Sequence, residues 1–489
     1  MWTLQQMFLG ILVCLFIFKY LKMKWEARSL PPGPSPLPLI GNLWTLNFSL
    51  NPDTLNKIAK HYGNIFTIWL GPTPMVVLHG CQAVKNALVS HSEEVSGRPT
   101  DSFLRDFSNG KGIVSSNGHN WKQQRRFGLM TLRNLGLGKR GLESRIQEEA
   151  QCLVDSIRAT NGKPIDASYI ITYAVANVIS DVAFGHRFSF DDVTFQKLVA
   201  CNNYLTEGLA SKWGRLYDAF PWLMRHVPGP HQKIFETKEY IDNFVRNEIR
   251  NHQENEKAEE PSDVIEYYLD KIRKTKGEPD TTFDEANMIQ VVVELFIAGT
   301  ETTVTTLQWA LLFMLVHPDI QVNIQKELDA VLEGPAVYYE DRKKLPYTNA
   351  VIHEVQRFGS IASVGIARTN INDMTLNGYS LKKDTMILAN LDSVLHDPQY
   401  WENPYAFNPN HFLDIDGNFS PNEAFLPFSA GHRVCLGEQL ARFELFIFFT
   451  MLVKSFNFHL PEGVSAVNTN YIADITLKPH PYKICAVPR

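Results

Sequence analysis

The chain has 489 residues, of which 44% are hydrophobic and 20% are charged. This composition is globular, and it excludes the disordered, collagen-like and coiled-coil classes. The 47 basic and 52 acidic residues leave a net charge of −5, which excludes the basic excess typical of a nucleic-acid-binding protein. The six cysteines lack C-x-x-C spacing, which excludes a disulfide scaffold and a cysteine-rich zinc site.

Residues 1–22 are predicted to form a transmembrane anchor. The segment from Trp2 to Leu21 is almost entirely apolar, and about 20 helical residues cross a bilayer core of about 30 Å. Lysines and Arg28 lie at its end and just beyond it, while no basic residue precedes it, so the positive-inside rule places the following chain in the cytosol. The alternative, a cleaved signal peptide, lacks a charged start and a cleavage site. We expect a retained anchor.

The remaining chain divides into a linker and one domain. Residues 23–38 are basic and then rich in proline, which predicts a stiff spacer. Residues 39–489 contain no repeat and no glycine- and serine-rich linker, so we expect a single catalytic domain.

The body is predicted to be mainly α-helical with small β-sheets. Apolar runs at 65–70 and 75–78 predict a hairpin. Helical periodicity predicts helices over 143–157, 169–183, 233–251, 264–275 and 285–316. The last helix follows a capping box from Thr282 to Glu285 and is apolar on nearly every face, so it belongs in the centre of the protein.

Cys435 carries the strongest chemical signal. It lies between Gly431 and Gly437, close to Arg433, at the entrance to a predicted helix. A sulfur at a helix amino terminus meets unpaired N–H groups, so we expect the thiolate to be favoured over the thiol. A lone thiolate suits a metal whose other positions are already filled, namely haem iron. The alternative is a reactive or merely packed cysteine.

The segment from Phe428 to Gly437 is similar to the F-x-x-G-x-R-x-C-x-G haem loop of the cytochromes P-450, and the resemblance extends from the proline-rich spacer to the carboxyl terminus. It implies the fold of that family, with a long central helix over haem b. Cys435 would be the axial ligand of the iron, and Phe428 and Arg433 would contact the cofactor.

A second motif, Ala298 to Thr303, resembles the oxygen-binding groove of the family. Gly299 in a helix costs about 1 kcal/mol relative to alanine. Glu301 places a carboxylate among apolar turns, which is also costly. A function would explain why both residues occur there. The resemblance implies that Ala298 contacts the haem and that Glu301 and Thr302 deliver protons. The alternative is a local kink with Glu301 reaching solvent.

Two further motifs place charged groups on helix faces. Glu354 and Arg357 match the family's E-x-x-R and, with His411, are expected to have a structural role. Trp121 and Arg125 match its W-x-x-x-R, and with Arg98 and Arg433 they would bind the haem propionates. A histidine that microsomal relatives often use here is absent, because the chain reads Gly365-Ile366.

The resemblance implies a microsomal monooxygenase that inserts one oxygen atom from O2 into xenobiotics, fatty acids or steroids. Its partners would be NADPH–cytochrome reductase and, as a second partner, cytochrome b5, at the cytosolic face of the endoplasmic reticulum. A basic patch of Lys122, Arg126, Arg133, Lys139 and Arg140 would bind the reductase or be only a solvated face. The predicted pocket residues are apolar: Phe103, Phe107, Ile113, Val114, Leu205, Leu209, Phe296, Ile361, Val364 and Ile472.

Two other functions stay open at this point. One is a haem-thiolate isomerase or dehydratase, which needs neither O2 nor a reductase and has no use for the Glu301–Thr302 relay. The other is a membrane-tethered haem carrier or sensor without catalysis, which leaves the energetically costly Glu301 unexplained.

Overall fold

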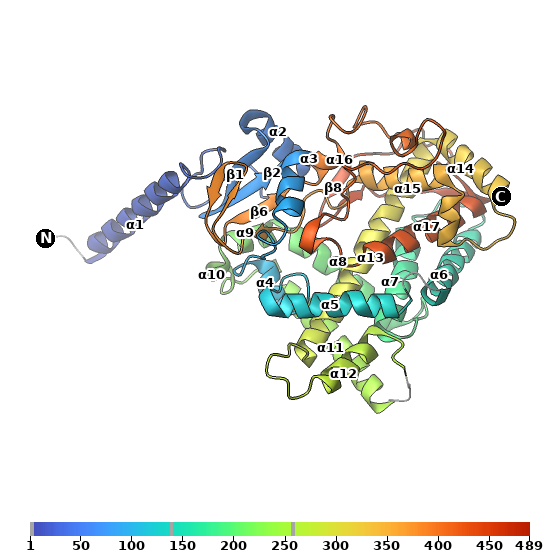
Figure 1. Ribbon diagram of the computed structural model, residues 1–489, viewed down its shortest axis with the longest axis horizontal. Helices are drawn as coiled ribbons and strands as arrows, with labels where there is room; N and C mark the ends of the chain where they lie inside the picture. Colours follow the sequence, from blue (N-terminus) through green and yellow to red (C-terminus); the bar gives the residue numbers. More distant parts are fainter. Residues whose placement is uncertain (1–3, 137–139, 256–259) are drawn as a thin grey trace.

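The computed structural model describes residues 4–136, 140–255 and 260–489. The helices are α1 Leu4–Glu26, α2 Pro52–Tyr62, α3 Cys81–Lys85, α4 Phe103–Ser108, α5 Gly118–Asn134, α6 Arg140–Arg158, α7 Ser168–Phe184, α8 Val193–Ala210, α9 Lys212–Ala219, α10 Pro221–Met224, α11 Pro230–Glu254, α12 Val264–Lys274, α13 Glu285–Val316, α14 Pro318–Val331, α15 Pro346–Gly359, α16 Asp392–Leu395 and α17 Glu438–Ser455. The prediction of a mainly α-helical body is confirmed (Figure 1).

The strands are short and form four small sheets. They are β1 Ile65–Leu70, β2 Thr73–Leu78, β3 Arg368–Thr369, β4 Met374–Leu376, β5 Tyr379–Leu381, β6 Met386–Ala389, β7 Phe456–His459, β8 Tyr471–Ala473, β9 Leu477–Pro479 and β10 Cys485–Pro488. The largest sheet has the order β1-β2-β6-β3, in which β2 and β6 are parallel and the other pairs antiparallel. The remaining strands pair as β4-β5, β7-β10 and β8-β9.

The long central helix α13 is the axis of the body. Nearly all of its second half is buried, in one large hydrophobic core with α7 and α17. Among the described residues it is the one helix long and apolar enough to cross a membrane, but two thirds of its most apolar window is buried inside the protein. It is therefore a core helix, as its sequence predicts.

The cap of α13 differs from the predicted one. The helix begins at Glu285, but the Asp284 side chain caps it by accepting from the Asn287 N–H. Thr282 instead donates its hydroxyl to Gln123 Oε1 of α5, at 2.8 Å. The prediction of a capping box at Thr282 is wrong, because the Thr282 side chain forms its hydrogen bond with a distant helix instead.

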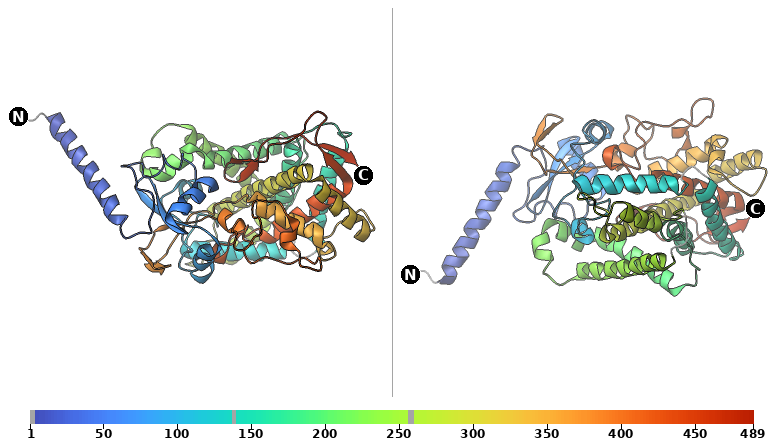
Figure 2. Two further views of the ribbon diagram at one scale, coloured as in Figure 1. Left: turned by 90° about the horizontal axis from the view of Figure 1, so that it is seen from above. Right: turned by 60° about the horizontal axis from the view of Figure 1, so that its bottom comes forward.

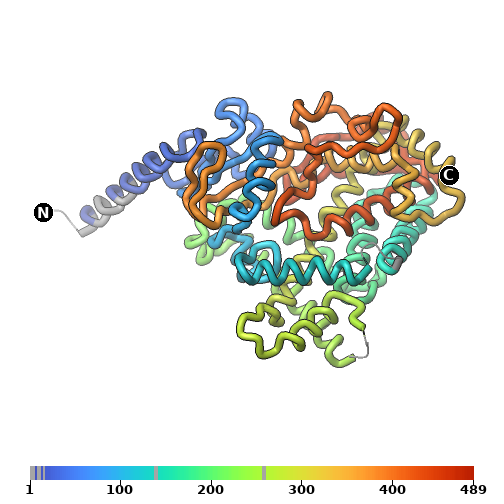
Figure 3. The backbone as a smooth tube through the Cα atoms, in the orientation of Figure 1, coloured from blue at the N-terminus to red at the C-terminus, as the bar shows by residue number. Residues whose placement is uncertain are grey.

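Helix α1 projects away from the body, and the trace then runs to a carboxyl terminus at the opposite end (Figures 2 and 3). Residues 1–3 of the predicted anchor lie outside the described part of the chain. Near the body-side end of α1, Leu21 and Trp25 are exposed, whereas Met23 is buried.

Candidate haem-thiolate site

The loop before α17 holds Cys435 in a tight backbone turn. The N–H of Cys435 donates to the carbonyl of Phe428 at 3.0 Å, and the N–H of Val434 donates to the carbonyl of Gly431 at 2.9 Å. Gly431 has a φ of +74°, and a Cβ there would lie 1.8 Å from the carbonyl oxygen of Leu88. Only glycine fits this position, so the loop sequence and the position of the sulfur are linked.

The thiol of Cys435 lies deep among protein atoms, although the residue retains accessible surface. Burial raises its pKa, although the N–H groups of Gly437 and Glu438 and the Arg125 guanidinium act in the opposite direction. The expectation that the helix terminus favours the thiolate is therefore wrong for the polypeptide alone, because desolvation outweighs the dipole. A metal cation deprotonates a coordinating thiol outright, so the thiolate requires the iron.

Four arginines gather beside this loop, and in the described part of the chain none of them forms an ion pair; Glu294 is the one carboxylate that acts electrostatically on Arg98 and Arg433. Arg433 donates to the carbonyls of Ser96, Ile113 and Ser116 at 2.7–3.0 Å, and its guanidinium lies 3.9 Å from the centre of the Trp121 ring. Arg125 donates to the Val434 carbonyl at 2.7 Å.

Arg98 continues this pattern. It donates to the carbonyls of Val114, Ile366 and Ala367 at 2.7–2.9 Å. Carbonyl oxygens satisfy these donors but do not neutralise their charges.

Sequence reasoning missed the fourth arginine, Arg368 of β3. Its Nη2 donates to Ser429 Oγ and to the Ala430 carbonyl, both at 3.0 Å, so it contacts the cysteine loop directly. The sequence analysis found only that Gly365-Ile366 lacks a histidine. No periodicity or motif marks an arginine in a two-residue strand, so the sequence held no signal for this contact.

The charges in this cluster oppose one another. Burial, together with Arg368 and Arg125, lowers the pKa of Arg433 to about 9. Burial, together with Arg125, lowers the pKa of Arg368 to about 10. Both remain cations at neutral pH, so the fold holds several buried positive charges close together.

Two buried donors in this cluster have no partner. They are Nε1 of Trp121 and Nη1 of Arg368. Buried N–H groups are normally paired, so orphaned donors beside uncompensated cations mark a place for an anion. The two propionates of a haem are anions of this kind, and its iron can be bound by the single sulfur of Cys435.

Helix α13 carries the residues of the predicted oxygen groove. Gly299 faces α7, where a Cβ would lie 2.5 Å from Cδ1 of Ile179, so this glycine permits close helix packing. Ala298 is exposed within this helix, and Thr302 donates its hydroxyl to the Ala298 carbonyl at 2.8 Å. Glu301 is buried and ion-paired, so the alternative in which it reaches solvent is wrong.

The E-x-x-R motif forms a closed structural network. Arg357 Nε and Nη2 pair with the two oxygens of Glu354, each at 2.7 Å, and both side chains are fully buried. The same guanidinium donates to the carbonyls of Leu395, Pro404 and Ala406. Nδ1 of His411 lies 3.1 Å from the Glu354 carboxylate. The motif is thus brought together as predicted, away from any open space.

The predicted pocket residues divide into two groups. Phe103, Phe107, Ile113, Leu205 and Phe296 are buried in the main core, where Leu209 and Ile361 pack against them. Val114 and Val364 are partly exposed and Ile472 is exposed. The residues of the first group expose little surface that a ligand could contact. The role of both groups as pocket residues stays a prediction.

Glu294 is a second residue that sequence reasoning missed. From α13, its Oε2 accepts from the N–H groups of Ile113 and Val114 at 2.6 and 3.1 Å. Burial raises its pKa to about 7. The carbonyls of Ile113 and Val114 in turn accept from Arg433 and Arg98, so Glu294 connects α13 to the arginine cluster.

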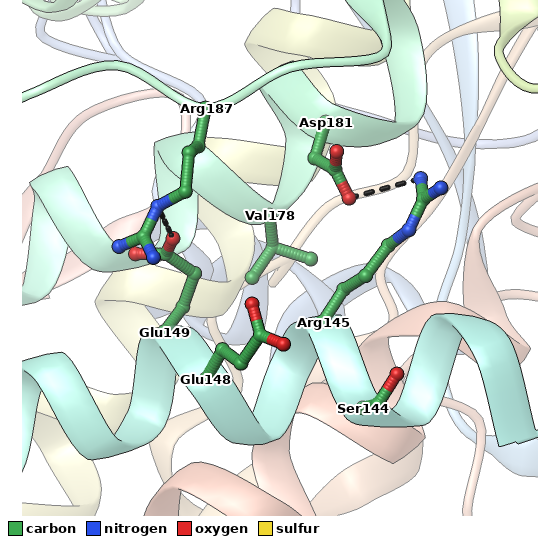
Figure 4. A pocket seen from close by; sticks show the side chains of 7 residues that line it. All are labelled: Ser144, Arg145, Glu148, Glu149, Val178, Asp181 and Arg187. Atoms are coloured by element: carbon green, nitrogen blue, oxygen red, sulfur yellow. Dashed lines mark ion pairs between the residues drawn. The ribbon is translucent and has the colours of Figure 1, made fainter.

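A cavity of about 300 Å³ lies elsewhere, between α6, α7 and Arg187 (Figure 4). Two ion pairs flank it, Arg187–Glu149 at 2.7 Å and Arg145–Asp181 at 2.9 Å. This charged lining does not fit a lipophilic substrate, and none of the predicted site residues contributes to it.

The cysteine loop, the uncompensated arginines and the groove of α13 together define a haem-thiolate protein. Comparison with known proteins agrees. Residues 31–486 match the family model described as "Cytochrome P450". The chain is 42% identical to human "Cytochrome P450 2J2" over 486 residues, covering 99% of this chain and 96% of the relative. It is 39% identical to human "Cytochrome P450 2C8" over 488 residues, covering 98% and 99%.

A relative from Mesocricetus auratus, "Cytochrome P450 2C25", is 41% identical over 489 residues, covering 98% of this chain and 99% of the relative. The chain belongs to the cytochrome P450 family. It is a monooxygenase that binds haem b, receives electrons from a redox partner and oxidises lipophilic small molecules with O2. The monooxygenase interpretation is thereby confirmed, in preference to the isomerase and the carrier.

Proposed function

We propose that Cys435 is the axial ligand of the haem iron and that Trp121, Arg98, Arg125, Arg368 and Arg433 bind the haem propionates. When bound, the haem supplies the redox chemistry that activates O2. The observation that carries this proposal is the set of buried cations and orphaned donors beside the loop of Cys435. Phe428 of the cysteine loop and Ala298 of α13 complete the predicted cofactor contacts.

The spectrum of the reduced, carbon monoxide-bound protein tests the ligand. We expect a strongly red-shifted Soret band in the full-length protein and its complete loss in Cys435→Ala, since only a thiolate ligand produces this shift. Cys485→Ala is the matched control, because Cys485 is also a buried free cysteine. A red-shifted band that survives in Cys435→Ala would contradict the assignment.

The side chains of α13 support a proton relay in the groove. Thr302 is partly exposed, and its hydroxyl is held on the Ala298 carbonyl, one turn earlier in the helix. Glu301 precedes it as a buried carboxylate. We assign proton delivery to these two residues, because a dry groove requires a positioned acid and a hydroxyl to pass the proton on.

The protein is a microsomal membrane enzyme, and we infer that α1 anchors it with its body in the cytosol. Trp44 and Trp222 are exposed, and the segments that carry them meet in one apolar cluster with β1. Exposed tryptophans at the end of the body near α1 suit a membrane interface. Protease added outside sealed microsomes should therefore digest the body, whereas protection would contradict this orientation.

The proposed electron donor is NADPH–cytochrome reductase, with cytochrome b5 as a second partner. Lys122 and Arg126 are exposed on α5, the helix that also carries Arg125 of the cofactor cluster. Lys139 of the predicted basic patch lies outside the described residues. Positive charge on this face suits an acidic partner, and steered association of this kind weakens with salt. A salt-independent rate of association with the reductase would contradict this role.

A further inference from the structure

The proton relay rests on Glu301, and the structure shows an unusual partner for it. Lys478 Nζ lies 3.1 Å from Glu301 Oε1 and 3.0 Å from Asp474 Oδ2. The side chain of Glu301 is only 7% exposed, whereas that of Lys478 is 23% exposed. Glu301 therefore belongs to a chain of three charges in which Lys478, the central member, is the most exposed.

Three donors converge on one oxygen of Glu301. Besides Lys478, the hydroxyls of Thr476 and Thr305 donate to Oε1 at 2.8 and 3.4 Å. Thr305 lies one turn further along α13, but Thr476 and Lys478 come from the β8-β9 hairpin. The orientation of this carboxylate is thus set largely by the hairpin and not by its own helix.

The hairpin is itself fixed against the central helix. Nε1 of Trp309, two turns after Glu301, donates to the Leu477 carbonyl at 2.8 Å. The N–H of Leu477 donates to the carbonyl of Ile361, a predicted pocket residue, at 2.9 Å. In the β8-β9 register, Lys478 lies opposite Ile472, another predicted pocket residue. One short hairpin therefore joins the predicted acid and the predicted substrate pocket.

The electrostatics agree with a functional ion pair. Burial acts to lower the pKa of Lys478, but the carboxylates of Glu301 and Asp474 outweigh it and raise that pKa. Lysine therefore stays protonated here at any neutral pH. Removing it would leave Glu301 as a buried carboxylate without its cation, which is far more costly than losing an exposed pair.

We propose that Lys478 is a positioning residue of the monooxygenase reaction, which holds Glu301 as an oriented carboxylate and fixes the β8-β9 hairpin against the oxygen groove. This inference deepens the proposed function and rests on the role of Glu301 in it. Lys478 itself acts through Glu301 and does not touch the substrate. Nothing in the sequence pairs it with Glu301, because the two are brought together only by the folding of the hairpin.

The first test is thermal unfolding of the full-length haem protein, which does not depend on activity. Lys478→Met should lower the unfolding temperature, because it leaves the buried Glu301 carboxylate without its cation. Glu301→Gln in the same chain should recover most of that loss. The charged groups at this contact in the described residues are Glu301 of α13 and Asp474 and Lys478 of the hairpin.

The second test is the yield of product per NADPH consumed. Lys478→Met should lower this yield about fivefold, whereas Lys478→Arg should restore it because it keeps the charge. Lys382→Met is the matched control, since it breaks an exposed ion pair of 2.8 Å with Asp373 and should change neither measurement.

The outcomes separate this inference from the function on which it rests. Additive effects of Lys478→Met and Glu301→Gln on unfolding, or an unchanged yield in Lys478→Met, would overturn it. A failure of Lys478→Arg to rescue would do the same. If Lys478→Met does not fold, the double variant Lys478→Met with Glu301→Gln should fold. If neither variant folds, the inference is overturned. Loss of the red-shifted Soret band in the unaltered protein would instead contradict the haem-thiolate assignment and leave the unfolding test intact.

Discussion

Two regions of this molecule bury arginines, and they neutralise them differently. Arg357 is fully buried, and the Glu354 carboxylate binds it in a bidentate pair while three carbonyls take its other donors. Arg368 and Arg433 are almost as buried, but they find carbonyls and hydroxyls and no carboxylate. Because a guanidinium stays protonated in proteins, the second region keeps a net positive charge that the polypeptide does not cancel. In the first region a carboxylate of the protein neutralises the buried arginine. In the second region only a bound anion can do so.

The largest expected effect comes from breaking the complete region. Arg357→Ala leaves the fully buried Glu354 without its cation, which costs about 3–5 kcal/mol of folding free energy. We expect little folded, haem-loaded protein, measured by its yield and its unfolding temperature. Arg158→Ala is the control, because its pair with Asp155 is of similar length but exposed and is worth about 1 kcal/mol or less. Equal losses in the two variants would contradict the contrast.

In the second region we expect a smaller effect, which weakens the haem-loaded protein but does not destabilise the haem-free chain. Arg368→Gln relieves repulsion among like charges, so the haem-free chain should unfold at the same temperature or higher. The loaded protein loses a hydrogen bond to a charged group, about 1.5–3 kcal/mol, so haem release should become about tenfold faster or more. Transfer of haem to an excess of a haem-binding acceptor protein measures that rate.

Arg250→Gln removes an exposed arginine bonded to Asn247 and serves as its control. A variant Arg368→Gln that destabilises the haem-free chain as strongly as Arg357→Ala would show that the two regions do not differ in kind.

The same contrast explains which residues the sequence could reveal. Glu354 with Arg357, and Trp121 with Arg125, are one helical turn apart, so their spacing alone places them on one face. The glycines of the cysteine loop likewise indicate a tight turn from the sequence, and Gly431 has the positive φ of +74° that such a turn requires. Local geometry made these parts of the site predictable.

The remaining parts depend on contacts between distant segments. Arg368 meets Ser429 across 61 positions and Glu294 meets Ile113 across 181. No spacing in the sequence encodes such a contact, because it exists only after the sheets and α13 are packed. The pKa of Cys435 could not be predicted for the same reason, since burial, which the sequence does not show, outweighs the helix terminus.

The smallest expected effect concerns Glu444, a buried carboxyl group that has no cation beside it among the described residues, just as the buried arginines of the second region have no paired carboxylate. Glu444 of α17 is buried, its Oε2 accepts from the Thr303 hydroxyl at 2.9 Å, and burial raises its pKa to about 8. A carboxyl group whose pKa is raised on folding stabilises the fold in its protonated form. That stability falls as pH rises from the ordinary carboxyl pKa, and it is lost through about pH 8.

Glu444→Gln stays neutral and keeps an acceptor for Thr303, so its unfolding temperature should exceed that of the unaltered protein by a few degrees near pH 8.5 and converge with it near pH 5. Glu438→Gln, on the same helix in a partly exposed pair with Arg442, should show no such divergence. Parallel pH curves for the two variants would contradict the buried, protonated state of Glu444. A buried carboxyl group without a cation beside it can take up a proton, whereas the buried arginines remain cations at neutral pH. That asymmetry is why an unpaired buried acid can remain a feature of the fold, whereas unpaired buried arginines indicate a ligand.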